Sequence, residues 1–267
     1  MDRGFLFGDG VYEVIPVYGG RLFRLAHHLK RLQNSLDAVR IANPLSESEW
    51  EAMLTALVER NHGSDQSVYL QVTRGVVQRR DHAFPDETRP TVLAMSSKSL
   101  EPVDIASIQG ITAITLPDIR WLHCNVKAIT LLPNVLLRQQ AIDAGSVEAV
   151  LLKDGNAIEG AASNLFIVKN GVLATPPNGP ALLPGITRDL VLELAAANEV
   201  PYRECSIPEA ELRGADEIWL TSSTREISPV TILDGHPVGT GQPGPAWKTM
   251  IGLYQGYKNR VRRGDAA

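Results

Sequence analysis

The chain has 267 residues and a mass of 29.1 kDa, which at about 150 residues per domain is enough for one large or two small domains. Its 44% hydrophobic and 21% charged residues exclude a disordered chain, a coiled coil and a collagen-like repeat. A net charge of -4 provides no strong positive field for nucleic acid or an anionic membrane. The two cysteines, Cys124 and Cys205, are too few for a disulfide framework or a zinc site made of thiolates, and we expect no metal.

Prolines and glycines interrupt the long uncharged stretch 170–187, whereas a membrane-spanning helix needs about twenty apolar residues in a row. The first residues lack the basic and apolar regions of a signal peptide. We therefore expect a cytoplasmic protein that binds no membrane.

The first part of the chain predicts a small α/β domain. Alternation over 10–18 predicts a strand that turns at Gly19-Gly20 into a second, short strand. Leucines from Leu25 to Leu36 recur at helical spacing. Further along we expect a helix over 46–60, capped by Ser46 or Ser48, and strands over 68–74 and 91–96. This domain is expected to span 1–99, with a linker over 100–110.

Residues 111–267 predict a larger domain. A helix over 134–144 is expected to end at Gly145, and Asn170-Gly171 is typical of a hairpin turn. The other expected elements are a helix over 187–197 and strands over 147–152, 164–168, 172–174, 217–221 and 227–233.

Two residues of this larger domain could carry chemistry. Lys127 follows a strand-like run, and its amine could form a Schiff base if a poorly solvated pocket kept it unprotonated. Glu159 leads into a turn of small residues and could act as a general base, a metal ligand or the partner of a protonated nitrogen. Taken alone, each is also consistent with an ordinary solvated side chain.

Two further segments could bind a phosphate. Gly185 precedes the predicted helix that includes Thr187, and a helix N-terminus offers unpaired N–H groups. Hydroxyls over 221–224 follow a predicted strand. The alternatives are that Thr187 only caps its helix and that the hydroxyls only satisfy a turn.

Two basic clusters could bind anions. Arg31 lies on a predicted helix with His27 and His28, which point to different faces. Arg80 and His82 lie in a loop between strands and could together face a small carboxylate. For both clusters the alternative is a solvated surface.

In this order and spacing, the clusters resemble the fold type IV pyridoxal-phosphate enzymes, and most of all the D-amino acid aminotransferases. The resemblance covers nearly the whole chain. It rests on Lys127, Glu159-Gly160 and the motifs that begin at residues 3, 7, 28, 73, 80, 118, 185 and 221, among them Phe7-Gly8-Asp9-Gly10-Val11-Tyr12-Glu13 and Gly185-Ile186-Thr187-Arg188-Asp189.

The resemblance implies an α+β fold of two domains, a small α/β N-terminal domain and a larger pseudo-barrel C-terminal domain that binds pyridoxal 5′-phosphate. It also implies a homodimer. The implied reaction is ping-pong transamination between a D-amino acid, such as D-alanine or D-glutamate, and a 2-oxo acid, pyruvate or 2-oxoglutarate.

It implies a role for each matching residue. Lys127 would hold the cofactor as a Schiff base and move the substrate proton, and Glu159 would face the pyridine nitrogen. The substrate α-carboxylate would be bound by Tyr12, Arg80 and His82. The phosphate would be bound by Arg31, Ile186, Thr187, Ser222 and Ser223, and the cofactor residues would be supported by Arg120, Ser163, Asn164 and Leu183.

The sequence departs from the family pattern at three places. Ala161 and Ala162 stand where relatives usually have hydroxyls. The loop 75–82 is one residue longer than usual, so that Arg79 competes with Arg80 for the carboxylate. The family motif begins almost at residue 2, and we expect a small domain shortened at its N-terminus.

Other functions on the same fold remain open. A branched-chain L-aminotransferase, an R-selective amine transaminase or an aminodeoxychorismate lyase would share Lys127 and Glu159. A protein that binds or stores the cofactor without turnover is a further alternative. The Arg80 and His82 pair favours the D-amino acid branch.

Overall fold

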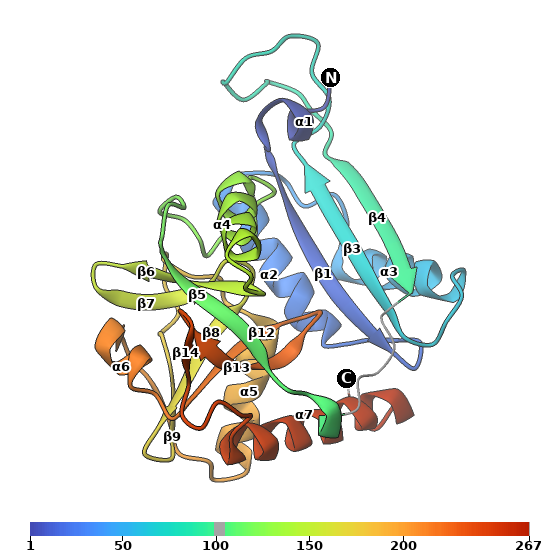
Figure 1. The fold of residues 1–267 in the computed structure, drawn as a ribbon. Coiled ribbons are helices and arrows are strands. Elements are labelled where there is room, and N and C mark those ends of the chain that lie inside the picture. The colour runs from blue at the N-terminus through green and yellow to red at the C-terminus, as the bar shows by residue number, and fades with distance from the viewer. Residues whose placement is uncertain (99–104, 267) are drawn as a thin grey trace. The chain divides into compact units, whose positions relative to one another are not determined.

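The computed structural model describes residues 1–98 and 105–266, which divide into two compact units (Figure 1). Unit 1 holds the described residues up to 98 together with Val126–Leu131 and 258–266, and unit 2 holds the rest. The predicted linker 100–110 begins within residues 99–104, which lie outside the described residues. The predicted domain bounds therefore stay predictions.

Unit 1 is an antiparallel sheet in the strand order β2-β1-β3-β4, with two longer helices. Val11 and Ile15 of the first long strand pack with Leu32 and Leu54 from those helices, and all four are buried. The elements are α1 (Arg3–Phe7), β1 (Gly10–Tyr18), β2 (Arg21–Leu22), α2 (Leu25–Ala38), α3 (Glu47–Glu59), β3 (Gln66–Thr73) and β4 (Thr91–Lys98).

The start of α3 is fixed by a reciprocal cap. The Ser46 hydroxyl accepts the Glu49 N–H at 3.4 Å, and the Glu49 carboxylate accepts the Ser46 N–H at 2.8 Å. This capping box satisfies two backbone donors that the helix itself cannot pair. Of the two predicted caps, Ser46 is therefore the one that the structure uses.

Unit 2 is built on a ten-stranded sheet in the order β10-β9-β8-β12-β13-β5-β6-β7-β11 with β14 beside β13. Because β7 also pairs with β8, the strands from β8 round to β7 close into a barrel whose interior holds Val150, Leu165 and Ile218. The elements are η1 (Ile105–Ser107), β5 (Ile111–Pro117), α4 (Leu132–Asp143), β6 (Glu148–Lys153), β7 (Asn156–Gly160), β8 (Asn164–Lys169), β9 (Val172–Thr175), α5 (Ile186–Ala197), β10 (Tyr202–Glu204), β11 (Ile207–Pro208), α6 (Glu209–Arg213), β12 (Glu217–Ser222), β13 (Glu226–Leu233), β14 (His236–Pro237) and α7 (Pro245–Arg263).

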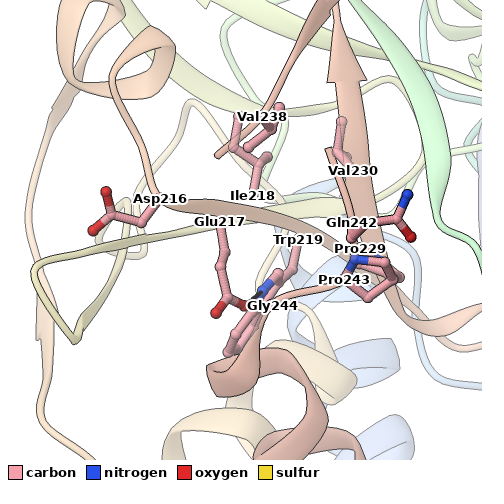
Figure 2. Close-up of a pocket in the computed structure, with 10 residues that line it drawn as sticks. All are labelled: Asp216, Glu217, Ile218, Trp219, Pro229, Val230, Val238, Gln242, Pro243 and Gly244. Atoms are coloured by element: carbon pink, nitrogen blue, oxygen red, sulfur yellow. Dashed lines mark hydrogen bonds between the residues drawn. The ribbon is translucent and has the colours of Figure 1, made fainter. Parts of the chain in front are cut away.

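A buried carboxylate begins the last helix of the chain. Glu217 accepts the Ala246 N–H at 2.9 Å and the Trp247 N–H at 2.8 Å, and the Trp219 indole N–H at 2.9 Å. These contacts lie beside a small pocket that Figure 2 shows at the start of α7. A negative charge at a helix N-terminus is favourable, so this carboxylate is a structural cap.

Apart from the strand-like run before Lys127, the predicted helices and strands are present within a few residues of their expected ends. Sequence reasoning missed several others, among them α1, β5, β7 and the long α7. Within the described residues, no helix is both long enough and apolar enough to cross a bilayer.

Candidate functional site

The segment around Lys127 lies along β1, although the two are more than a hundred residues apart in the chain. The Tyr12 N–H donates to the Lys127 carbonyl at 3.0 Å, and the Ile129 N–H donates to the Gly10 carbonyl at 3.1 Å. The Lys127 N–H donates to Ser35 Oγ of α2 at 3.1 Å. Its Nζ lies 4.1 Å from the centroid of the Tyr12 ring. The lysine is thus held by a strand and a helix of unit 1.

The expected strand before Lys127 is not formed. β5 ends at Pro117, and the residues from there to Lys127 are turns and irregular backbone. The placement of the lysine comes instead from the backbone bonds to β1.

Gly8 allows the Lys127 segment to lie close to β1. Its φ is +66°, and a Cβ at this position would lie 2.4 Å from Thr130 Cγ2. Any other residue would be strained and would also displace the Lys127 segment. The glycine of the Phe7-Gly8-Asp9-Gly10 motif therefore has a direct structural role.

A buried ionic cluster lies on the helix side of β1. Arg31 donates to the two Glu13 carboxylate oxygens at 2.8 and 2.7 Å, and His28 Nδ1 lies 2.7 Å from Glu13 Oε2. Burial disfavours the Glu13 carboxylate, but Arg31 and His28 outweigh burial and hold its pKa at about 2. Burial lowers the pKa of His28, although the neighbouring Glu13 carboxylate acts to raise it. Arg31 is only 6% exposed, so the alternative of a solvated face is wrong for it.

Sequence reasoning missed Glu13 as a member of this cluster. The alternation of β1 puts Glu13 on the same face as Val11 and Ile15, which are core residues. A carboxylate on an apolar strand face requires a positive partner, and that signal was present in the sequence.

Glu159 lies near the end of β7 and is one of the buried acids of unit 2. It accepts hydrogen bonds from Arg120 Nη1, from Asn164 Nδ2 at 3.1 Å and from the Leu183 N–H at 3.2 Å. Burial raises its pKa to about 7, although Arg120 and the Leu183 N–H both act to lower it. It is only 3% exposed, which rules out the alternative of a solvated loop carboxylate.

Arg120, Asn164 and Leu183, three of the four residues expected to support Glu159, are joined with it in one network. Arg120 donates to the Asp118 carboxylate through Nε and Nη2, both at 2.9 Å, as well as to Glu159. Asn164 also donates to the Leu183 carbonyl at 2.7 Å. Ser163 lies in the same turn, where its carbonyl accepts the Gly160 N–H at 2.7 Å.

The N-terminus of α5 carries backbone donors that the helix itself does not pair. Its N-cap is Gly185, which makes no side-chain cap, so the alternative that Thr187 caps the helix is wrong. Ile186 and Thr187 begin the helix, and both are buried. Their N–H groups precede the first helical bond, which the Asp189 N–H makes to the Gly185 carbonyl at 2.9 Å.

Hydroxyls at the end of β12 belong to the same unit, and α5 packs on that strand. Thr221 Oγ1 is buried and has no hydrogen-bond partner within residues 1–98 and 105–266. Ser222 Oγ accepts the Arg225 N–H at 3.2 Å, so this hydroxyl does satisfy a turn. Ser223 is half-buried beside it.

Arg80 and His82 lie in the exposed loop between β3 and β4, and both side chains contact the Phe7 ring. The Tyr12 ring lies beside Lys127 Nζ and stacks on Tyr69 at 5.8 Å between centroids.

Comparison with known proteins assigns the chain to a family. Residues 10–233 match the family model described as amino-transferase class IV. The D-alanine aminotransferase of Bacillus licheniformis is 42% identical over 93% of this chain and 87% of its own. The branched-chain amino acid aminotransferase of Escherichia coli has a structure with a TM-score of 0.90, 28% identity and coverage of 96% of this chain and 88% of its own. A second branched-chain amino acid aminotransferase, from T.th. and solved with pyridoxamine 5′-phosphate, has a TM-score of 0.88, 25% identity and coverage of 96% and 87%.

The chain therefore belongs to the class IV aminotransferases. The predicted fold class, a small α/β domain with a larger pseudo-barrel domain, is confirmed by the sheet of unit 1, the closed barrel of unit 2 and the solved relatives.

The residues present fit pyridoxal 5′-phosphate. The start of α5 and the Thr221 hydroxyl, which has no partner among the described residues, supply donors suited to a phosphate. Burial raises the pKa of Glu159, although Arg120, which also pairs with Asp118, acts to lower it. A protonated ring nitrogen would give this buried carboxylate a positive partner of its own.

Proposed function

We propose that this enzyme transfers an amino group between a D-amino acid, such as D-alanine or D-glutamate, and a 2-oxo acid, such as pyruvate or 2-oxoglutarate. The observation that carries the proposal is 42% identity over 93% of the chain to a D-alanine aminotransferase. Arg80 and His82, which lie together against Phe7, supply donors for the α-carboxylate that such substrates have.

Lys127 is the proposed catalytic residue. When bound, pyridoxal 5′-phosphate supplies an electron-accepting ring that acidifies the substrate Cα–H. Nζ of Lys127 would hold the cofactor in the resting enzyme and would accept the proton from the substrate Cα during the reaction. The contacts of its backbone with Tyr12 and Ser35 hold the lysine in place for this transfer.

Glu159 and the start of α5 are proposed to bind opposite ends of the cofactor. Glu159 accepts a hydrogen bond from the ring nitrogen and keeps that nitrogen protonated. The N–H groups of Ile186 and Thr187 bind the phosphate, together with Ser222, Ser223 and Arg31. Since Arg120, Asn164 and Leu183 contact Glu159, they orient its carboxylate.

D-specificity follows from where the α-carboxylate is held. If Tyr12, Arg80 and His82 hold it on one side, only one enantiomer can direct its Cα hydrogen toward Lys127. Amino donor and acceptor then use the same site in turn, which predicts ping-pong kinetics. A homodimer and a cytoplasmic location are further proposals that rest on the family resemblance.

A branched-chain L-aminotransferase is the second candidate. Solved branched-chain enzymes share the fold, but at 28% and 25% identity they are more distant than the D-alanine aminotransferase at 42%. Activity with L-leucine but not with D-alanine would favour this candidate.

Reductive trapping tests the role of Lys127. Borohydride treatment of the wild-type holoenzyme should fix the cofactor on the peptide that contains Lys127. Lys127→Ala should lose this label and at least about three orders of magnitude in rate, because one amine serves as both attachment point and base. Lys30→Ala, which changes an exposed lysine of α2, should behave as wild type. Label retained by Lys127→Ala would contradict the assignment.

A further inference from the structure

The short helix α1 (Arg3–Phe7) contacts the loop that carries Arg80 and His82. Arg3 is only 3% exposed, and its guanidinium donates to three consecutive carbonyls of that loop. The distances are 2.7 Å to the Asp81 oxygen, 3.3 Å to the His82 oxygen and 3.2 Å to the Ala83 oxygen. One side chain therefore fixes the backbone on both sides of His82.

Arg3 is itself held by a carboxylate. Its Nε donates to Asp9 Oδ2 at 2.7 Å, and Arg74 donates to the same carboxylate at 2.8 and 3.0 Å. Burial acts against the Asp9 carboxylate, but Arg74 and Arg3 outweigh it and hold its pKa below the ordinary value. Asp9 therefore stays charged at neutral pH and keeps Arg3 in place.

Phe7, one helical turn after Arg3, contacts the two side chains themselves. The Arg80 guanidinium lies 4.8 Å from the centroid of the Phe7 ring, and the His82 ring lies 5.1 Å from it at an interplanar angle of 41°. An arginine over an aromatic face is attracted by the ring quadrupole. The ring thus restricts two exposed side chains that would otherwise sample many rotamers.

We propose that Arg3 and Phe7 are positioning residues for the substrate carboxylate: Arg3 fixes the loop backbone and Phe7 orients Arg80 and His82. The inference rests on the proposed function, because it takes these two side chains as the carboxylate site. Ordering a flexible arginine opposes binding, and a platform that orders it before the substrate arrives removes that cost. The platform therefore acts on substrate affinity more than on the proton transfer.

Replacement of the ring tests this effect. Phe7→Leu should raise KM for D-alanine by about tenfold and leave kcat within about twofold. The same variant should change the reaction of D-alaninol, which lacks the carboxylate, far less. Phe7→Tyr keeps an aromatic face and should restore KM. The matched control is Phe5→Leu, which changes a 98% exposed ring of the same helix and should behave as wild type. An equal loss with both substrates, or an unchanged KM for D-alanine, overturns the proposal.

NMR spectra and proteolysis test how α1 holds the loop, and neither requires turnover. In NMR spectra of the holoenzyme, the Cε1–H resonance of His82, assigned from its loss in His82→Gln, should shift in Phe7→Leu and not in Phe5→Leu. Arg3→Lys keeps the positive charge but loses the planar guanidinium that donates to three loop carbonyls. The loop should loosen, and tryptic cleavage at Arg79 and Arg80 should become faster. If the wild-type enzyme fails to turn over D-alanine, the proposed function is wrong, yet these two measurements still decide whether α1 holds the loop. An unshifted resonance and an unchanged cleavage rate overturn the inference.

Discussion

Two buried carboxylates, Glu13 and Glu159, have pKa values displaced in opposite directions. Burial disfavours both anions. Glu13 has Arg31 and His28 against it, and its pKa falls to about 2. Glu159 shares Arg120 with Asp118, whose negative charge acts against it, and its pKa rises to about 7. Since both carboxylates are buried, their hydrogen-bonding and charged partners decide the direction of the shift.

Glu159→Gln tests whether the negative charge of Glu159 assists proton abstraction. The variant keeps the shape but cannot hold the ring nitrogen protonated, so proton abstraction from Cα should slow by about 10²-fold. The measurement is single-turnover absorbance with D-alanine. An unchanged rate would show that Glu159 has another role.

The pKa of Glu159 also predicts a pH dependence of stability in the cofactor-free enzyme. The pKa of Glu159 is about 7 in the folded state and near 4.5 in the unfolded state, so the folded state binds the proton more tightly. Its contribution to the free energy of unfolding is complete below the unfolded pKa and is lost as pH rises through the folded pKa. Glu159→Gln should therefore flatten the fall in stability over this range in denaturant titrations, and the exposed Glu199→Gln should not.

Arg80→Ala tests the carboxylate site. A lost charged hydrogen bond, with its partner left unpaired, should lower kcat/KM for D-alanine by about 10²-fold. Amines without a carboxylate should change far less. Arg79→Ala is the control, because Arg80 is the loop arginine whose guanidinium lies over the Phe7 ring. A selective loss in Arg79→Ala would move the role by one residue, and no loss in either variant would remove the main support for D-specificity.

At the scale of elements, the loop before α5 joins the predicted phosphate site to Glu159. The Leu183 N–H donates to Glu159, and Asn164 donates to the Leu183 carbonyl at 2.7 Å. Gly185 follows two residues later, and a Cβ there would lie 1.9 Å from Asn164 Oδ1. A φ of -79° suits any residue, so the backbone conformation does not require a glycine here. The close approach of Asn164 does.

Gly185→Ala should therefore weaken cofactor binding. Displacement of Asn164 or of the loop should cost about 1–3 kcal/mol, the range for overpacking a tight site. Titration of the cofactor-free enzyme with pyridoxal 5′-phosphate measures the change in Kd. Gly179→Ala is the control, because a Cβ there would meet no atom of the described residues within 4 Å. Equal affinities in the two variants would show that this loop does not shape the phosphate site.

Elements with strong local patterns were predictable, and those without were not. The alternation over β1 and the leucine spacing in α2 both correspond to the observed elements. β7 (Asn156–Gly160) is short and contains polar residues, so its strand character comes from pairing with β6 and β8. In α7, Gly252 and Gly256 lower helix propensity by about 1 kcal/mol each, although the spacing of Trp247, Met250 and Tyr254 does indicate a buried helical face.

At the scale of the whole molecule, the limits of sequence reasoning are set by long-range contacts. The Lys127 segment belongs to unit 1 through its bonds to β1, and no local pattern places it there. The pairing of β7 with β8 closes the barrel of unit 2, and barrel closure depends on the register of every strand in turn. The family motifs assign the residue roles, which stay predictions, whereas a partner such as Ser35 required the fold.

The proposed activity of this class IV aminotransferase is the transamination of D-amino acids, with Lys127 holding pyridoxal 5′-phosphate. A half-reaction absorbance scan of the wild-type holoenzyme tests it most directly, with D-alanine, L-alanine, L-leucine and an R-amine added separately and no 2-oxo acid present. D-alanine is expected to convert the cofactor band to that of pyridoxamine phosphate, the L-amino acids to leave it unchanged, and pyruvate then to restore it. Conversion by L-leucine with no response to D-alanine would contradict the assignment to D-amino acids.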